Sequence, residues 1–181
     1  ETVTGDAYVL ALGSFSPQLA RQAGVPLSIY PAKGYSATLP VLDPTLAPEV
    51  SLTDDEYKLV FSRLGDRLRV AGTAELNGYG LALNPVRCEA LVKRTLDIFP
   101  GMSRPELAQY WAGLRPATPG NVPYIGASKV RGLYLNTGHG TLGWTHGCGS
   151  GRAVAEIIDG RQPEVDFAFT GREAMQTAPR L

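Results

Sequence analysis

The stretch from Gly138 to Gly151 is the part of the sequence best suited to chemistry, because six of its fourteen residues are glycine. Each glycine costs backbone entropy on folding, so this density is a poor way to build a plain loop. It would let the backbone approach a flat or anionic group closely. A helix is expected to follow directly and to end near Ile158, so its first N–H groups point back into the loop. The pattern predicts an anion or a polarised carbonyl at the helix start; packing alone is the alternative.

The spacing Gly138-x-Gly140-x-x-Gly143 after an apolar strand also matches the dinucleotide-binding fingerprint, and Asp166 lies some twenty residues further on. In that fingerprint the helix opens within the glycines, whereas residues 144–146 are expected here to precede the helix. The match also lies near the end of the chain, although such folds normally open with it. A dinucleotide-dependent reductase that uses residues 138–166 is kept as an alternative.

Arg115 is the second candidate for chemistry. It is expected to end a strand over residues 110–115, with Pro116 directly behind it and with Trp111 and Leu114 indicating apolar surroundings. A guanidinium in an apolar wall presents a planar fork that can bind a carboxylate through two parallel hydrogen bonds. The alternative is an ordinary surface ion pair.

The other polar residues carry weaker signals. The two histidines, His139 and His146, have structural hydrogen bonding as their default role, and no nucleophile–base arrangement has a recognisable spacing. Cys88 and Cys148 are too few for a disulfide framework, which favours a reducing compartment, and Cys148 is expected to be a small packed residue. Several tyrosines could reach a substrate, although burial in the core is their default: Tyr35, Tyr57, Tyr79 and Tyr124.

The two ends of the chain indicate pieces of one α/β domain. The apolar run 7–12 predicts a strand covered on both faces, followed by a turn and a short helix with Ser16 as N-cap, Pro17 at its first position and Gly24 at its end. Two short strands are expected at 124–126 and 133–135, and a last one over 165–169.

The middle of the chain has a different character. Strands are expected over 27–40 and 57–75, with a hairpin turn at Gly65-Asp66, and a surface connection over 42–55. A helix opens at Asn84-Pro85 and a further strand covers 106–114. The fold class is therefore α+β, with an antiparallel-sheet domain over 27–115 flanked by a partial α/β domain made of 1–26 and 116–181.

Composition limits the functions that need to be considered. Seventeen Lys and Arg against seventeen Asp and Glu give a net charge of zero, which argues against nucleic acid as a partner. No apolar run approaches the ~20 residues of a membrane span, and no signal peptide opens the chain. The chain lacks an initiator Met and enters a strand at once, so we expect it to be part of a longer polypeptide.

Three segments at their particular spacing resemble the C-terminal part of FAD-dependent D-amino-acid dehydrogenases, within the D-amino-acid oxidase and glycine oxidase superfamily. Residues 6–13 are similar to that family's second flavin-domain strand, and residues 31–35 to the entry into its substrate domain. The three segments are Trp111-Ala-Gly-Leu-Arg-Pro-Ala-Thr-Pro-Gly120, Pro123-Tyr-Ile-Gly126 and Leu135-Asn-Thr-Gly-His-Gly-Thr-Leu-Gly-Trp-Thr145.

The resemblance implies oxidation of a D-amino acid to a 2-oxo acid and ammonia by hydride transfer to FAD, with no dedicated catalytic base. Arg115 would grip the substrate carboxylate, and Tyr35 and Tyr57 are expected to be further substrate contacts. The following helix would stabilise negative charge on the reduced flavin. Electrons would pass to a quinone or another carrier, which implies a bacterial cytoplasmic enzyme with peripheral contact to the inner membrane. The cofactor residues would be Gly13, Gly138, His139, Gly140, Thr141, Leu142, Gly143, Trp144 and Thr145.

One departure from the family matters. The N-terminal glycine fingerprint that holds the ADP half of FAD is not in these 181 residues. We therefore expect the missing N-terminal part of the same protein to be a partner of this chain, and the chain alone to retain FAD poorly and to be inactive. An oxygen-dependent amine or glycine oxidase of the same superfamily and a non-catalytic module that binds small carboxylates are the alternatives.

Overall fold

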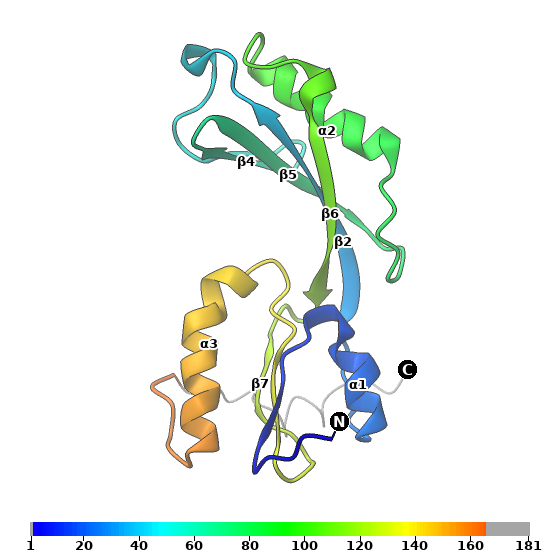
Figure 1. Ribbon diagram of the computed structural model, residues 1–181, viewed down its shortest axis with the longest axis vertical. Coiled ribbons are helices and arrows are strands. Elements are labelled where there is room, and N and C mark those ends of the chain that lie inside the picture. Colours follow the sequence, from blue (N-terminus) through cyan, green and yellow to red (C-terminus); the bar gives the residue numbers. More distant parts are fainter. Residues whose placement is uncertain (1, 166–181) are drawn as a thin grey trace. The chain divides into compact units, whose positions relative to one another are not determined.

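The computed structural model describes residues 2–165, and these divide into two compact units. One unit is made of residues 2–31 and 115–165, and the other of Ala32–Leu114. Figure 1 shows the elements of each unit. The predicted domains, 1–26 with 116–181 and 27–115, follow the same order along the chain and stay a prediction.

The first unit is built on a three-stranded sheet with the order β1-β8-β7. Strand β1 (Tyr8–Leu10) runs parallel to β8 (Leu133–Thr137), and β7 (Tyr124–Ala127) runs antiparallel to β8. Both strands predicted near 124–126 and 133–135 are therefore present. The strand predicted over 7–12 is shorter, and the one predicted over 165–169 lies almost wholly outside the described residues.

Helices lie on the two faces of this sheet and cover its central strand β8, which explains why that strand is apolar on both sides. Helix α1 (Ser16–Gln22) and the segment after it pack on one face, and helix α3 (Gly143–Ile158) packs on the other (Figure 1). Neighbouring residues of β8 divide between the faces, because Leu135 joins the α1 side and Tyr134 the α3 side. The unit is thus a three-layer α/β fragment, as the two ends of the sequence predicted.

The second unit contains a five-stranded sheet with the order β3-β4-β5-β2-β6 and one long helix. Adjacent strands from β3 to β2 pair antiparallel, and Gly65, with φ of 65°, turns the chain between β4 and β5. Helix α2 (Pro85–Ile98) packs on β5. The strands are β2 (Tyr30–Pro40), β3 (Leu52–Asp54), β4 (Leu59–Leu64), β5 (Arg67–Glu75) and β6 (Gln109–Ala117).

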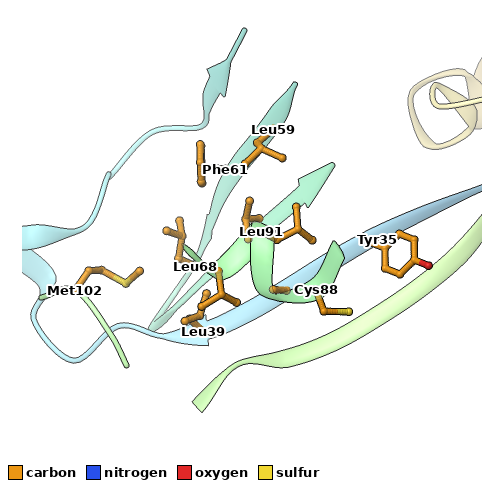
Figure 2. Close-up of a cluster of buried hydrophobic side chains, with 11 residues drawn as sticks. Tyr35, Leu39, Leu59, Phe61, Leu68, Cys88, Leu91 and Met102 are labelled. Atoms are coloured by element: carbon orange, nitrogen blue, oxygen red, sulfur yellow. The ribbon is translucent and has the colours of Figure 1, made fainter. Parts of the chain in front are cut away.

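One face of this sheet and the inner face of α2 form the core of the second unit (Figure 2). Asn84 caps the helix as predicted, because its side-chain oxygen accepts the N–H of Val86 at 3.0 Å. The rings of Phe61 and Phe99 meet edge to face, with centroids 5.4 Å apart. The buried core residues are Tyr35, Ala37, Leu39, Leu59, Phe61, Leu68, Val70, Cys88, Leu91, Val92 and Met102.

Three predictions about these elements are wrong in detail. The connection predicted over 42–55 contains the short 3-10 helix η2 (Pro44–Leu46) and the edge strand β3. The strand predicted over 106–114 begins after the 3-10 helix η3 (Pro105–Leu107) and runs to Ala117, so Arg115 lies inside it. Ser16 is the first residue of α1, not its N-cap, because its hydroxyl is engaged by Thr137.

Candidate cofactor and carboxylate site

The carboxyl ends of β1 and β8 define the candidate site. These strands run parallel with Leu10 opposite Leu135, so the chain leaves both of them at the same edge of the sheet. Ligands of α/β sheets bind at this edge. Gly13 follows β1 in the 3-10 helix η1 (Gly13–Phe15), and Gly138 follows β8. Both glycines have positive φ, 53° and 83°.

Hydrogen bonds join the two strand ends. The hydroxyl oxygens of Ser16 and Thr137 lie 2.7 Å apart, and the Thr137 hydroxyl donates to the carbonyl of Gly13 at 3.2 Å. Both side chains are buried. The start of α1 is therefore fixed to the end of β8, which gives the edge a defined shape.

The turn that follows β8, residues 138–142, lies against the end of β6. The Gly140 N–H donates to the carbonyl of Pro116 at 3.0 Å, and the Leu142 N–H donates to His139 at 3.0 Å. A Cβ added to Gly138 would lie 2.8 Å from Cγ2 of Thr118, so only glycine fits there. At Gly140, with φ of 56°, no described atom lies within 4 Å of an added Cβ. The first glycine thus packs against Thr118, the residue that follows β6, and the second keeps space open.

Helix α3 begins earlier than the sequence predicted. Its first residue is Gly143, and no side chain of the described residues caps its N-terminus. Trp144 is fully exposed, and Thr141 and Leu142 are exposed in the turn before it. Residues 144–146 were predicted to precede the helix, and this prediction, which argued against a dinucleotide fingerprint, is wrong because α3 begins at the third glycine. Asp166 lies outside the described residues. The helix N–H groups are directed toward the turn, as expected.

Arg115 is mounted on the same side of the first unit. It directly precedes Pro116, whose carbonyl accepts the Gly140 N–H and whose ring lies 3.8 Å from an added Cβ at Gly13. The guanidinium is half-buried, and desolvation lowers its pKa below the ordinary value of an arginine. The apolar wall predicted from Trp111 is wrong: this ring is mostly exposed and lies over Arg69 at 5.5 Å.

The site also contains polar atoms without a protein partner. Among the described residues, four buried side-chain polar atoms make no hydrogen bond, and three of them lie on the two segments that the Gly140–Pro116 bond joins. Burial and the nearby His146, whose ring centroid is 6.3 Å away, lower the pKa of His139 below 6.5. The three atoms are Thr118 Oγ1, Asn136 Oδ1 and His139 Nε2.

The predicted substrate tyrosines lie in the second unit. The Tyr35 ring is buried in the core, and its hydroxyl donates to Glu75 (Figure 2 shows the hydroxyl at the end away from the cluster). Tyr57 is 55% exposed, and the Arg94 guanidinium lies over its ring at 4.1 Å. Their contact with a substrate stays a prediction.

These features fit a ligand that is both flat and polar. The turn offers open space at Gly140, uncapped helix N–H groups at Gly143 and unpartnered polar atoms beside Gly138. Thr118 and Asn136 were not predicted from the sequence. A threonine or an asparagine in a sequence gives no sign that its polar atom will be buried without a partner. Within residues 2–165, no helix is long and apolar enough to cross a bilayer.

Comparison with known proteins identifies close relatives. The chain is 64% identical over 169 residues to a D-amino acid dehydrogenase of Dechloromonas aromatica (strain RCB). The matched region covers 93% of this chain and 40% of that protein. The chain is 56% identical over 170 residues to a D-amino acid dehydrogenase of Paramagnetospirillum magneticum (strain ATCC 700264 / AMB-1), covering 94% and 40%. The chain thus spans about two fifths of the length of these curated relatives.

Solved structures share the fold. Glycine oxidase from Geobacillus kaustophilus superposes with a TM-score of 0.79 at 24% identity, over 90% of this chain and 44% of that one. Iminodiacetate oxidase from Chelativorans sp. BNC1 gives a TM-score of 0.79 at 22% identity, over 94% and 48%. The family model described as FAD dependent oxidoreductase matches residues 1–157. This chain belongs to the DAO family of FAD-dependent oxidoreductases.

Proposed function

We propose that this chain is the part of a D-amino acid dehydrogenase that binds the substrate carboxylate and one side of FAD. The relatives that carry this name match nearly the whole chain. The observation that carries the proposal is the Gly140–Pro116 hydrogen bond, because it ties the segment that bears Arg115 to the glycine turn. A carboxylate-binding group and a backbone cradle then belong to one site.

The residues of this chain would bind and orient. The guanidinium of Arg115 carries a positive charge at neutral pH and would hold the α-carboxylate of the substrate through its fork. Gly13, the turn 138–142 and the first residues of α3 would hold FAD, which supplies the acceptor for a hydride when it is bound. The N–H groups at Gly143 would favour negative charge on that ligand.

The proposed reaction is a two-electron oxidation. The α-hydrogen leaves the D-amino acid as a hydride and the amine loses a proton, which gives an imino acid. Water then hydrolyses the imino acid to a 2-oxo acid and ammonia. Such a transfer depends mainly on orientation and on a neutral amine, so this chain need not supply a base.

The electron acceptor separates the proposed dehydrogenase from an oxidase of the same family. Glycine oxidase shares the fold, so an enzyme that reduces oxygen is the second candidate. Peroxide formed in proportion to the 2-oxo acid would favour the oxidase, and reduction of an added quinone without peroxide would favour the dehydrogenase. For the dehydrogenase we propose peripheral contact with a membrane that holds the quinone. A carboxylate-binding module without chemistry would need Arg115 but not the glycine turn.

We also propose that β1 is covered by the remainder of a longer enzyme. Tyr8 and Val9 point to opposite faces of the sheet and are 50% and 46% exposed, and Phe15 is exposed after them. An edge strand that is apolar on both faces is an aggregation hazard unless another element covers it. The length of the relatives beyond the matched two fifths would supply that element.

The test is the cofactor content and substrate response of the full-length protein. We expect the purified protein to show flavin absorbance, which a D-amino acid bleaches under anaerobic conditions and its L-enantiomer does not. The 181-residue chain alone is expected to lose FAD on gel filtration. A full-length protein without flavin, or one that no D-amino acid reduces, would contradict the proposal.

A further inference from the structure

Thr118 carries a buried hydroxyl that has no role in the site described above. Its side chain is 7% exposed, and its hydroxyl makes no hydrogen bond to any described residue. A buried hydroxyl without a partner loses its hydration and gains nothing in exchange, so such groups are rare in folded proteins. The backbone around it is fixed, because the Thr118 carbonyl accepts the Asn121 N–H at 3.2 Å.

Thr118 lies directly against the glycine turn. Its Cγ2 is the atom that would meet a Cβ at Gly138 at 2.8 Å, and Gly138 precedes His139, whose Nε2 is also buried without a partner. Thr118 thus touches the glycine turn, and the residue after Gly138 carries a second buried polar atom with no partner among the described residues. Asn136, the third residue of this kind, pairs with Ile125, which packs on the α3 side, so we leave it out of the assignment.

The chemistry of this pair selects its ligand. A hydroxyl and a neutral imidazole can each donate or accept a hydrogen bond, and neither carries a charge. The His146 ring centroid lies 6.3 Å from that of His139, and burial together with this neighbour lowers the pKa of His139, which favours its neutral form. Such a pair suits an uncharged polar edge that has both donors and acceptors, whereas a carboxylate suits Arg115.

We propose that Thr118 and His139 hydrogen-bond the uncharged polar edge of the flavin ring, and that Thr118 is a cofactor-binding residue. This inference rests on the proposed function. It divides the site into a neutral end beside Gly138 and a cationic end at Arg115. It also gives the unpartnered hydroxyl a partner that is present only in the cofactor-bound protein.

The experiment uses the full-length protein and its Thr118→Val variant, which keeps the shape of the side chain and removes the hydroxyl. FAD is titrated into each protein after the cofactor has been stripped, and thermal unfolding of the stripped proteins is followed separately. We expect the Kd for FAD to rise roughly three- to tenfold, since one hydrogen bond is lost. The unfolding midpoint of the stripped variant should be unchanged or higher, because a buried unpartnered hydroxyl is gone.

Two further variants complete the test. Ser103→Ala removes the other unpartnered buried hydroxyl of the described part of the chain, which lies in the second unit, and should leave the Kd unchanged. Thr118→Ser keeps the hydroxyl and should bind FAD as the wild type does, which also covers a failure of the valine variant to fold. An unchanged Kd in Thr118→Val, or a lower midpoint of its stripped form, overturns the assignment of Thr118 alone. A wild-type protein that binds no FAD overturns the proposed function as well.

Discussion

Two buried polar regions of this protein differ in how fully their atoms are paired. In the second unit, Lys33 is 1% exposed, and its ammonium donates to Glu75 at 2.9 Å and to the carbonyl of Ala82 at 2.9 Å. Glu75 also accepts the Tyr35 hydroxyl. In the first unit, the residues beside Gly138 leave polar atoms with no partner among residues 2–165. The first arrangement is complete within the protein, and we propose that a ligand completes the second.

The degree of hydrogen-bond pairing separates a structural polar cluster from a candidate binding site, whereas residue type does not. A buried lysine, tyrosine and glutamate would attract attention as a catalytic cluster from their types alone. Their mutual hydrogen bonds instead hold β2, β5 and the chain near Ala82 together. A threonine and a histidine beside a glycine turn have ordinary types, and it is their unpartnered atoms that lead us to propose a binding region there.

The largest effect on stability is expected at Gly138. Gly138→Ala combines a left-handed backbone with a clash against buried Thr118, so the free energy of unfolding should fall by about 2–5 kcal/mol. Gly65→Ala, at the hairpin turn, has a similar φ but open space, so it should cost only about 1–2 kcal/mol. Urea unfolding of both variants measures the difference. Equal losses would mean that Gly138 does not pack against Thr118 as described.

Arg115→Ala is expected to have the largest effect on activity. Arg115 is half-buried, and loss of its charged group should lower kcat/KM of the full-length enzyme. The loss should correspond to roughly 2–4 kcal/mol of activation free energy and arise mainly from a higher KM. Arg63→Ala, on the exposed hairpin, is the control and should change kcat/KM less than about twofold. Steady-state rates with a D-amino acid measure kcat/KM of both variants. A change within about twofold for Arg115→Ala removes this residue from the site.

Substitution of Gly140 tests the open space at the turn. Gly140→Val should abolish flavin retention while leaving the far-UV circular dichroism spectrum largely intact. Gly140→Asn tolerates the left-handed backbone but still fills the space, so its affinity for FAD should fall by about tenfold. Gly24→Asn, which also has positive φ and open space, should leave FAD binding unchanged. Retention of FAD by both Gly140 variants would show that no ligand approaches this glycine.

The sequence predicted best where the signal was local. Asn84-Pro85 caps α2 as expected, and Gly65 turns the hairpin, because caps and turns depend on a few adjacent residues. The start of α3 was misplaced because its glycines disfavour a helix, whereas packing of Ala153 and Val154 against the sheet stabilises it. The short edge strand β3 was missed for a similar reason: it depends on pairing with β4.

The candidate site could be predicted only in part. The glycine turn and Arg115 stand out by composition and by spacing. The Ser16–Thr137 bond and the unpartnered hydroxyl of Thr118 depend on contacts between distant parts of the chain, which no local pattern encodes. Tyr35 and Tyr57 were chosen by residue type, which does not reveal that Glu75 accepts the Tyr35 hydroxyl.

The pH dependence of stability should separate the two polar regions by smaller effects. His139 has a lowered pKa, so it favours the folded state above its ordinary value of 6.5, and this contribution is lost as the pH falls below 6.5. The Tyr35 hydroxyl and Lys33 lower the pKa of Glu75, so its contribution is complete above 4.5 and is lost only at more acidic pH. Urea unfolding across this range should show both losses.

Two substitutions assign these losses to their groups. His139→Asn should remove the change that begins below pH 6.5, and Glu75→Gln should remove the one that begins below pH 4.5. Persistence of the upper change in His139→Asn would show that another group causes it.

Hydrogen–deuterium exchange of the full-length protein, with and without FAD, shows whether the glycine turn contacts the cofactor. We expect bound FAD to slow exchange of the backbone amides at residues 138–146 and near Gly13. We also expect FAD to leave exchange at the hairpin turn around Gly65 unchanged. Equal exchange at residues 138–146 in both states, in a protein that demonstrably holds FAD, would contradict this contact.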